Sequence, residues 1–139
     1  MTERSFQMRL FCRYAQPDNA VADLKVEVLA DGQWKDFDLN PETAGFLILV
    51  YAIFSCQHLY LRTNCAEQGL LLDSAEGAIE LVASEDWEVQ KLHINFEIKL
   101  KSVPQYEGDL GYIIERMKQC PVSRNLRPIT DSETVVRLA

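Results

Sequence analysis

Residues 40–69, NPETAGFLILVYAIFSCQHLYLRTNCAEQG, form the segment that decides the fold, because they predict a single long helix. The opening Asn40-Pro41-Glu42 supplies a capping side chain, a residue suited to the first helical turn and a carboxylate for the positive end of the helix dipole. The closing glycine is a typical C-terminal stop. Positions 46–54 are apolar almost all round, which is typical of a buried central helix or of one packed against a second subunit. Because one small sheet covers such a helix incompletely, we expect a dimer.

Alternating apolar and polar residues predict strands on both sides of this helix. Before it, positions 6–12 and 24–30 follow the two-residue period of half-buried strands, and the turn dipeptide Asp31-Gly32 precedes a returning strand at 34–39. Residues 1–40 are therefore predicted to form an antiparallel meander.

The remaining core, 41–139, combines this helix with further strands and a second helix. Positions 70–72 and 78–83 suggest a strand around a turn at 74–77, and 92–100 alternate most regularly of all. A helix is expected from about 105 to 119, followed by a short helical turn and a last strand at 134–138.

Length and composition limit the classes of protein to consider. The chain has 139 residues, of which 47% are hydrophobic, so one domain spanning 1–139 is expected. A net charge of -7 without any basic run argues against nucleic acid and anionic membranes as partners. The first residues lack the pattern of a secretory signal, and the longest apolar run is far shorter than the roughly 20 residues of a membrane span. We expect a cytoplasmic protein.

Cysteines carry the possible chemistry of this chain. Cys120 directly precedes Pro121, which suits the first position of a short helix, where backbone N–H groups stabilise a thiolate. The competing interpretation is a small buried apolar residue, which is the commoner role of a free cysteine. Cys56 lies inside the long helix and needs a neighbouring charge to react. Cys65 lies about two and a half turns further on and points to a different side of the helix, so it is not expected to pair with Cys56, and Cys12 is predicted to be a core residue.

The two histidines give little support for other chemistry. His58 lies about 200° round the helix from Cys56, too far to act as its base within one chain, and His93 lies on the polar face of its strand. Without CxxC spacing and with only two imidazoles, we expect no metal and no cofactor.

Two segments together resemble the OsmC/Ohr family. The stretch AIFSCQHLYLR (52–62), closing with CAEQG (65–69), resembles the first-cysteine helix of that family, which commonly ends in Ala-Glu-x-x-Gly. The stretch ERMKQCPVSRNL (115–126) is similar to its second-cysteine motif, in which Cys-Pro-(Val/Ile)-(Ser/His) precedes a leucine. Both motifs occur in the family's order, and the resemblance covers roughly residues 46–128.

The resemblance implies an α+β fold in which antiparallel sheets wrap around long central helices of an intertwined homodimer. It implies that Cys56 is the peroxidatic cysteine, which attacks the peroxide and becomes a sulfenic acid, and that Cys120 is the resolving cysteine, which condenses with it to a disulfide. Organic hydroperoxides are the implied substrates, and a dithiol reductant such as a lipoyl or thioredoxin-like protein is the implied partner.

The chain departs from the family at the residues that activate the thiol. Catalytic members place a glutamate about ten residues before the first cysteine, paired with an arginine from the amino-terminal strands. Here that position is Phe46, so Glu42, with Arg9 or Arg13, remains as the candidate pair. Three hypotheses follow: a thiol peroxidase, a redox-sensing or binding protein without efficient turnover, and a thiol-dependent hydrolase or transferase that uses a histidine of a partner subunit.

Overall fold

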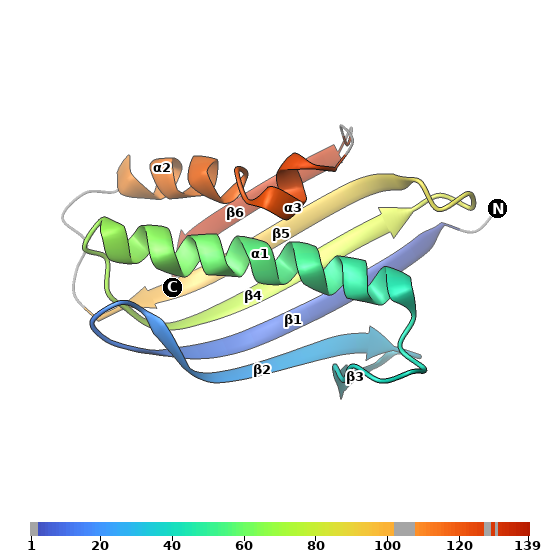
Figure 1. Cartoon of the computed structure of the whole chain (residues 1–139), viewed down its shortest axis with the longest axis horizontal. Helices are drawn as coiled ribbons and strands as arrows, with labels where there is room; N and C mark the ends of the chain where they lie inside the picture. Colours follow the sequence, from blue (N-terminus) through green and yellow to red (C-terminus); the bar gives the residue numbers. More distant parts are fainter. Residues whose placement is uncertain (1–2, 102–107, 127–128, 130) are drawn as a thin grey trace.

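The computed structural model describes residues 3–101, 108–126, 129 and 131–139 of the chain (Figure 1). Its elements in chain order are β1 (Arg4–Ala15), β2 (Ala20–Ala30), β3 (Gln33–Asp36), α1 (Gly45–Glu67), β4 (Leu72–Ala83), β5 (Val89–Leu100), α2 (Gly108–Met117), α3 (Pro121–Arg124) and β6 (Asp131–Leu138). The predicted α+β class is confirmed by these elements. The start predicted for the second helix, at about 105, lies outside the described residues.

One six-stranded sheet has the order β3-β2-β1-β4-β5-β6. Its strand pairs are antiparallel except β5 and β6, which run parallel, so the expectation of purely antiparallel sheets needs correction. The reason is the connection: the chain leaves β5, passes through α2 and α3, and returns in the same direction, as a crossover requires. β4 is a continuous strand rather than two short ones around a turn at 74–77, because it pairs with β1 and β5 along its length.

Helix α1 begins four residues later than the sequence predicts, at Gly45 rather than Pro41. Asn40 Oδ1 accepts the N–H of Glu42 at 2.8 Å, and the Thr43 hydroxyl donates to the Asp38 carbonyl at 2.8 Å. These bonds hold the chain in a turn ahead of the helix, as Asn and Thr side chains often do. The predicted stop is confirmed by Gly69, whose φ of +74° is a conformation that favours glycine.

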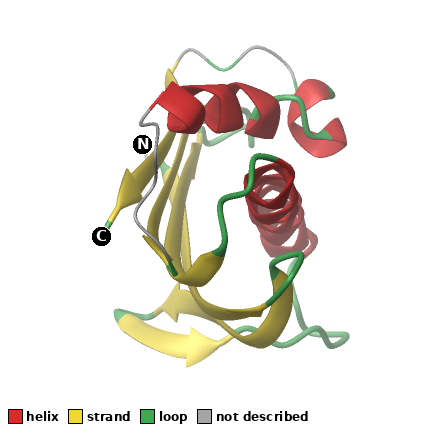
Figure 2. Cartoon of the chain, turned by 90° about the vertical axis from the view of Figure 1, so that its left-hand side faces the viewer, coloured by secondary structure: helices red, strands yellow, loops and turns green. Residues whose placement is uncertain are grey.

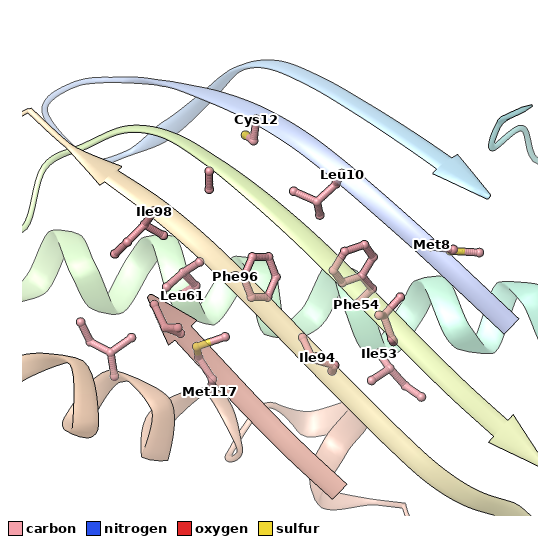
Figure 3. Packing of buried hydrophobic residues seen from close by; sticks show 14 of the residues in the cluster. Met8, Leu10, Cys12, Ile53, Phe54, Leu61, Ile94, Phe96, Ile98 and Met117 are labelled. Carbon is pink, nitrogen blue, oxygen red and sulfur yellow. The ribbon is translucent and has the colours of Figure 1, made fainter. Parts of the chain in front are cut away.

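Helix α1 packs along one face of the sheet, and the core lies between these two layers (Figures 1 and 2). Figure 3 shows Phe54 of α1 beside Phe96 of β5, and their ring centroids are 5.6 Å apart. Gly77 of β4 makes room for both rings, because a Cβ there would lie 2.6 Å from Phe96 Cε1 and 3.1 Å from Phe54 Cζ. The sheet and α1 therefore approach closely just before Cys56.

The side of α1 away from the sheet is apolar and only partly covered. Val50 and Ile53 are fully buried, whereas Ile48 and Leu59 are 43% and 42% exposed. By length and composition α1 could cross a membrane, since an 18-residue window within it has a mean hydropathy of 1.3, but a single such helix is weak evidence because core helices of soluble proteins share these properties. Within the part of the chain that the structure describes, an apolar face of α1 is thus left without a partner.

Candidate active site

Cys120 caps the short helix α3 as the sequence predicts. Its backbone has φ −58° and ψ 142°, Pro121 opens the helix, and Cys120 Sγ accepts the N–H of Ser123 at 3.4 Å. The residue is fully buried. A sulfur in this position receives hydrogen bonds from the first helical turn, which is the arrangement that stabilises a thiolate.

Cys56 meets Cys120 across the contact between α1 and α3. Burial raises the pKa of the Cys56 thiol, the backbone N–H of Val122 lowers it by donating a hydrogen bond, and interaction with the Cys120 thiol raises it. Val122 and Ser123 therefore turn consecutive backbone N–H groups toward the two sulfurs. Both thiols are free, and Cys56 is the more accessible of the two because it is only half-buried. The structure brings together the two cysteines that the resemblance pairs.

A chain of polar side chains continues from Cys120 into the protein. The Cys120 thiol donates to Ser123 Oγ at 3.0 Å, Gln57 Nε2 donates to the same oxygen at 3.1 Å, and the Thr134 hydroxyl donates to Gln57 Oε1 at 3.1 Å. Gln57 is only 3% exposed. Sequence reasoning assigned no role to Gln57 or Thr134, although a glutamine in so apolar a helix signals a buried polar group that needs partners.

A pocket of about 300 Å³ lies beside this chain. Gln57, Ser123 and Thr134 line it together with further polar and apolar side chains, among them Ser132 and Lys118. The site therefore has a polar cavity on the Cys120 side, large enough for several water molecules at about 30 Å³ each.

The residues predicted to activate Cys56 lie elsewhere within the chain. Glu42 is exposed in the turn before α1, and the helix alone spans roughly 16 Å from its first residue to Cys56. Phe46, at the position of the family's glutamate, packs against Phe6 and Trp87 with ring centroids 5.0 and 5.1 Å away. No carboxylate of the helix start therefore reaches the thiol from this side.

Arg9 and Arg13 belong to the face of the sheet opposite α1. Their neighbours on β1, such as Leu10 and Cys12, are the buried residues that point toward the helix. Arg9 donates to Glu27 at 2.8 Å and lies 4.3 Å from the ring centroid of Trp34. Among residues 3–101, 108–126, 129 and 131–139, no guanidinium contributes to the pKa of Cys56. Roles for Glu42, Arg9 and Arg13 in activating Cys56 stay predictions.

Both histidines are occupied by other partners. Tyr14 and His58 share a buried hydrogen bond of 2.7 Å between Oη and Nε2, and burial followed by the Arg62 charge lowers the pKa of His58 to about 4. His93 pairs with Asp131 at 2.7 Å on the outer face of the sheet. Among the residues that the structure describes, neither imidazole is bonded to a cysteine of its own chain, so the hydrolase hypothesis still requires a histidine from a partner subunit.

Cys12 is a core residue, as the sequence predicts, and Cys65 belongs to the core as well. Both are buried, and burial raises the pKa of each thiol, that of Cys65 to about 12. Burial of this kind disfavours the thiolate, which is the reactive form of a cysteine. Neither Cys12 nor Cys65 is among the groups that shift the pKa of Cys56.

The mixed six-stranded sheet covered by α1, with one cysteine on α1 and another at the start of α3, has the architecture of OsmC-like proteins. The chain is similar over 93% of its length to an OsmC-like protein from Mycoplasma pneumoniae, of which 94% is covered, at 13% identity and a TM-score of 0.55. It is also similar to an OsmC-like hydroperoxide resistance protein from Jannaschia sp. CCS1, over 87% of this chain and 85% of that one, at 11% identity and a TM-score of 0.55. The chain has the OsmC-like fold, which confirms for the fold the resemblance seen in the two cysteine motifs. No protein-family model and no curated protein matches the sequence.

Proposed function

We propose that this protein is a cysteine-based thiol peroxidase that reduces organic hydroperoxides through a Cys56–Cys120 disulfide. The observation that carries the proposal is the meeting of the two thiols across the α1–α3 contact, with Val122 and Ser123 N–H groups donating to them. The hydroperoxide resistance named for the Jannaschia protein supports the choice of substrate.

The reaction has three balanced steps. The Cys56 thiolate attacks one oxygen of the peroxide, the O–O bond breaks, and an alcohol leaves after taking up a proton, so that Cys56 becomes a sulfenic acid. The Cys120 thiol then attacks the Cys56 sulfur, and water leaves as the disulfide forms. A dithiol reductant, a lipoyl or thioredoxin-like protein, returns both cysteines to thiols and is itself oxidised to a disulfide.

The apolar outer face of α1 supports a homodimer. Ile48 and Leu59 are more than two-fifths exposed on a helix whose opposite face is fully buried. A second copy would remove this surface from water and would bring further side chains near Cys56, which is half-buried on the same helix. The proposed dimer is cytoplasmic and needs no cofactor, because the two thiols supply the electrons.

A second candidate is a redox-sensing or binding protein with slow turnover. The raised pKa of Cys56, together with an aromatic cluster where a glutamate would be expected, favours this alternative. A thiol without an activating charge holds little thiolate at neutral pH and reacts slowly.

Peroxide consumption by single-cysteine variants tests the proposal. With cumene hydroperoxide and a dithiol reductant, Cys56→Ser should abolish turnover, because it removes the attacking sulfur. Cys120→Ser should allow one oxidation of Cys56 followed by slow turnover and overoxidation. Cys12→Ser is the matched control and should keep the wild-type rate. Equal residual rates in the Cys56 and Cys120 variants would refute the role assignment.

A further inference from the structure

Ser123 and Gln57 hold the sulfur of Cys120 in one orientation. The Cys120 thiol donates to Ser123 Oγ at 3.0 Å, while the Ser123 N–H donates back to the sulfur at 3.4 Å. The thiol proton is thus directed at Ser123, which leaves a lone pair of the sulfur free for another partner. That partner is Cys56, whose thiol interacts with the Cys120 thiol.

Gln57 fixes the serine in turn. Its Nε2 donates to Ser123 Oγ at 3.1 Å, so this oxygen accepts two hydrogen bonds, and its Oε1 accepts from the Thr134 hydroxyl at 3.1 Å. The glutamine is only 3% exposed and connects α1, α3 and β6. Both bonds are part-buried, and together they fix the rotamer of the glutamine and the position of the Ser123 hydroxyl.

The chain of hydrogen bonds ends beside water-accessible space. Three of its members, Gln57, Ser123 and Thr134, line the pocket of about 300 Å³, to which Lys118 and Ser132 add polar groups. Because Ser123 itself lines the pocket, its hydroxyl can take up the proton of Cys120 and pass its own proton to water there, whereas Gln57, which donates to Ser123 Oγ, carries no proton.

We propose that Ser123 and Gln57 are positioning residues for disulfide formation: Gln57 orients the Ser123 hydroxyl, and Ser123 orients the Cys120 thiol toward Cys56, takes up its proton and passes its own hydroxyl proton to water in the pocket. In this step the Cys120 S–H bond breaks, an S–S bond forms to the Cys56 sulfur, and the sulfenic oxygen leaves as water after taking up a proton. The inference rests on the proposed function but concerns its second step alone.

The test separates the two steps in the full-length protein. Reduced protein receives one equivalent of cumene hydroperoxide, and mass spectrometry follows Cys56 sulfenic acid, trapped with dimedone, and the Cys56–Cys120 disulfide. Ser123→Ala should leave the first oxidation unchanged and slow the disulfide about tenfold, the factor that one lost hydrogen bond gives. Ser123→Thr restores the hydroxyl and should restore the rate, which a merely structural defect would not show.

Two further variants complete the design. Gln57→Met keeps the size of the side chain but removes its hydrogen bond to Ser123, so it should also slow disulfide formation. It serves as the test variant if Ser123→Ala fails to fold. Thr63→Ala is the control in α1, the helix that carries Gln57. It removes a hydroxyl that, among the described residues, bonds the Leu59 carbonyl alone, and it should change neither oxidation step.

The outcomes distinguish a failure of the positioning roles of Ser123 and Gln57 from a failure of the proposed peroxidase function. Disulfide formation at the wild-type rate in both Ser123→Ala and Gln57→Met would overturn the inference and leave the peroxidase intact. If peroxide fails to oxidise wild-type Cys56, the proposed function is wrong. The attack of Cys120 is then measured with diamide, which adds to one thiol and is displaced by the second as the disulfide forms. Equal rates with diamide would overturn the inference there as well.

Discussion

Replacing Gly77 with alanine tests whether the close approach of α1 to the sheet controls the cysteine pair. The added Cβ would lie 2.6 Å from Phe96 Cε1 and 2.9 Å from Phe96 Cδ1, shorter than any ordinary contact, with Phe54 Cζ at 3.1 Å. Both rings belong to fully buried residues, so neither can swing into solvent. Overpacking of this kind costs about 2 kcal/mol.

The melting temperature converts this cost into a measurable shift. At about 2.1 cal/mol/K per residue, unfolding entropy for a chain of this length is about 0.3 kcal/mol/K, so Gly77→Ala should melt about 7 °C lower. Phe54 lies two residues before Cys56, and its displacement should also slow formation of the Cys56–Cys120 disulfide.

A matched glycine controls for the loss of backbone freedom. Gly111 lies in α2 with nothing within 4 Å of its added Cβ, so Gly111→Ala should raise stability by up to about 1 kcal/mol through helix propensity. Calorimetry of both variants measures the two melting temperatures, which should change in opposite directions. A melting temperature of Gly77→Ala within a degree of the wild type would refute the packing argument.

Three further predictions follow from buried polar groups. Asn19→Ala should lower the free energy of unfolding by about 3 kcal/mol in urea titrations, because Asn19 is fully buried and bonds two carbonyls and the Leu72 N–H; a loss below 1 kcal/mol would contradict this role. The pKa of His58 is lowered to about 4, so the unfolded chain binds the extra proton first as pH falls, and stability should drop by about 2 kcal/mol from pH 7 to pH 5; His58→Gln should abolish most of that drop. The raised pKa of the Cys56 thiol in the single chain predicts that, in protein diluted to the monomer, its oxidation by peroxide accelerates about tenfold per pH unit with no plateau below pH 9, and a plateau near pH 7 in stopped-flow traces would contradict this.

Regular patterns made much of the fold predictable. The period of two residues at 92–100 and the apolar run at 46–54 correspond to β5 and the centre of α1, because side-chain periodicity follows backbone geometry directly. The start of α1 was not predictable from capping preferences, since Asn40 and Thr43 satisfy themselves within a turn. Propensity alone cannot decide between two sets of local hydrogen bonds.

The candidate site was predictable only in part. Cys120 before Pro121 indicates a helix start from local sequence, and the structure places it there. The contact with Cys56 depends on how α3 packs on α1, which no local pattern contains, so only the family resemblance pointed to it. Gln57 and Thr134 were missed because they are 77 residues apart and become partners through the crossover to β6.

The most direct test of the central claim is thiol mass spectrometry on the reduced protein after one equivalent of cumene hydroperoxide, in parallel with hydrogen peroxide. The account predicts a Cys56–Cys120 disulfide that forms within seconds and faster with the organic peroxide, while Cys12 and Cys65 stay reduced. Cys56 and Cys120 that remain reduced for many minutes would contradict the peroxidase and leave an OsmC-like fold with another use.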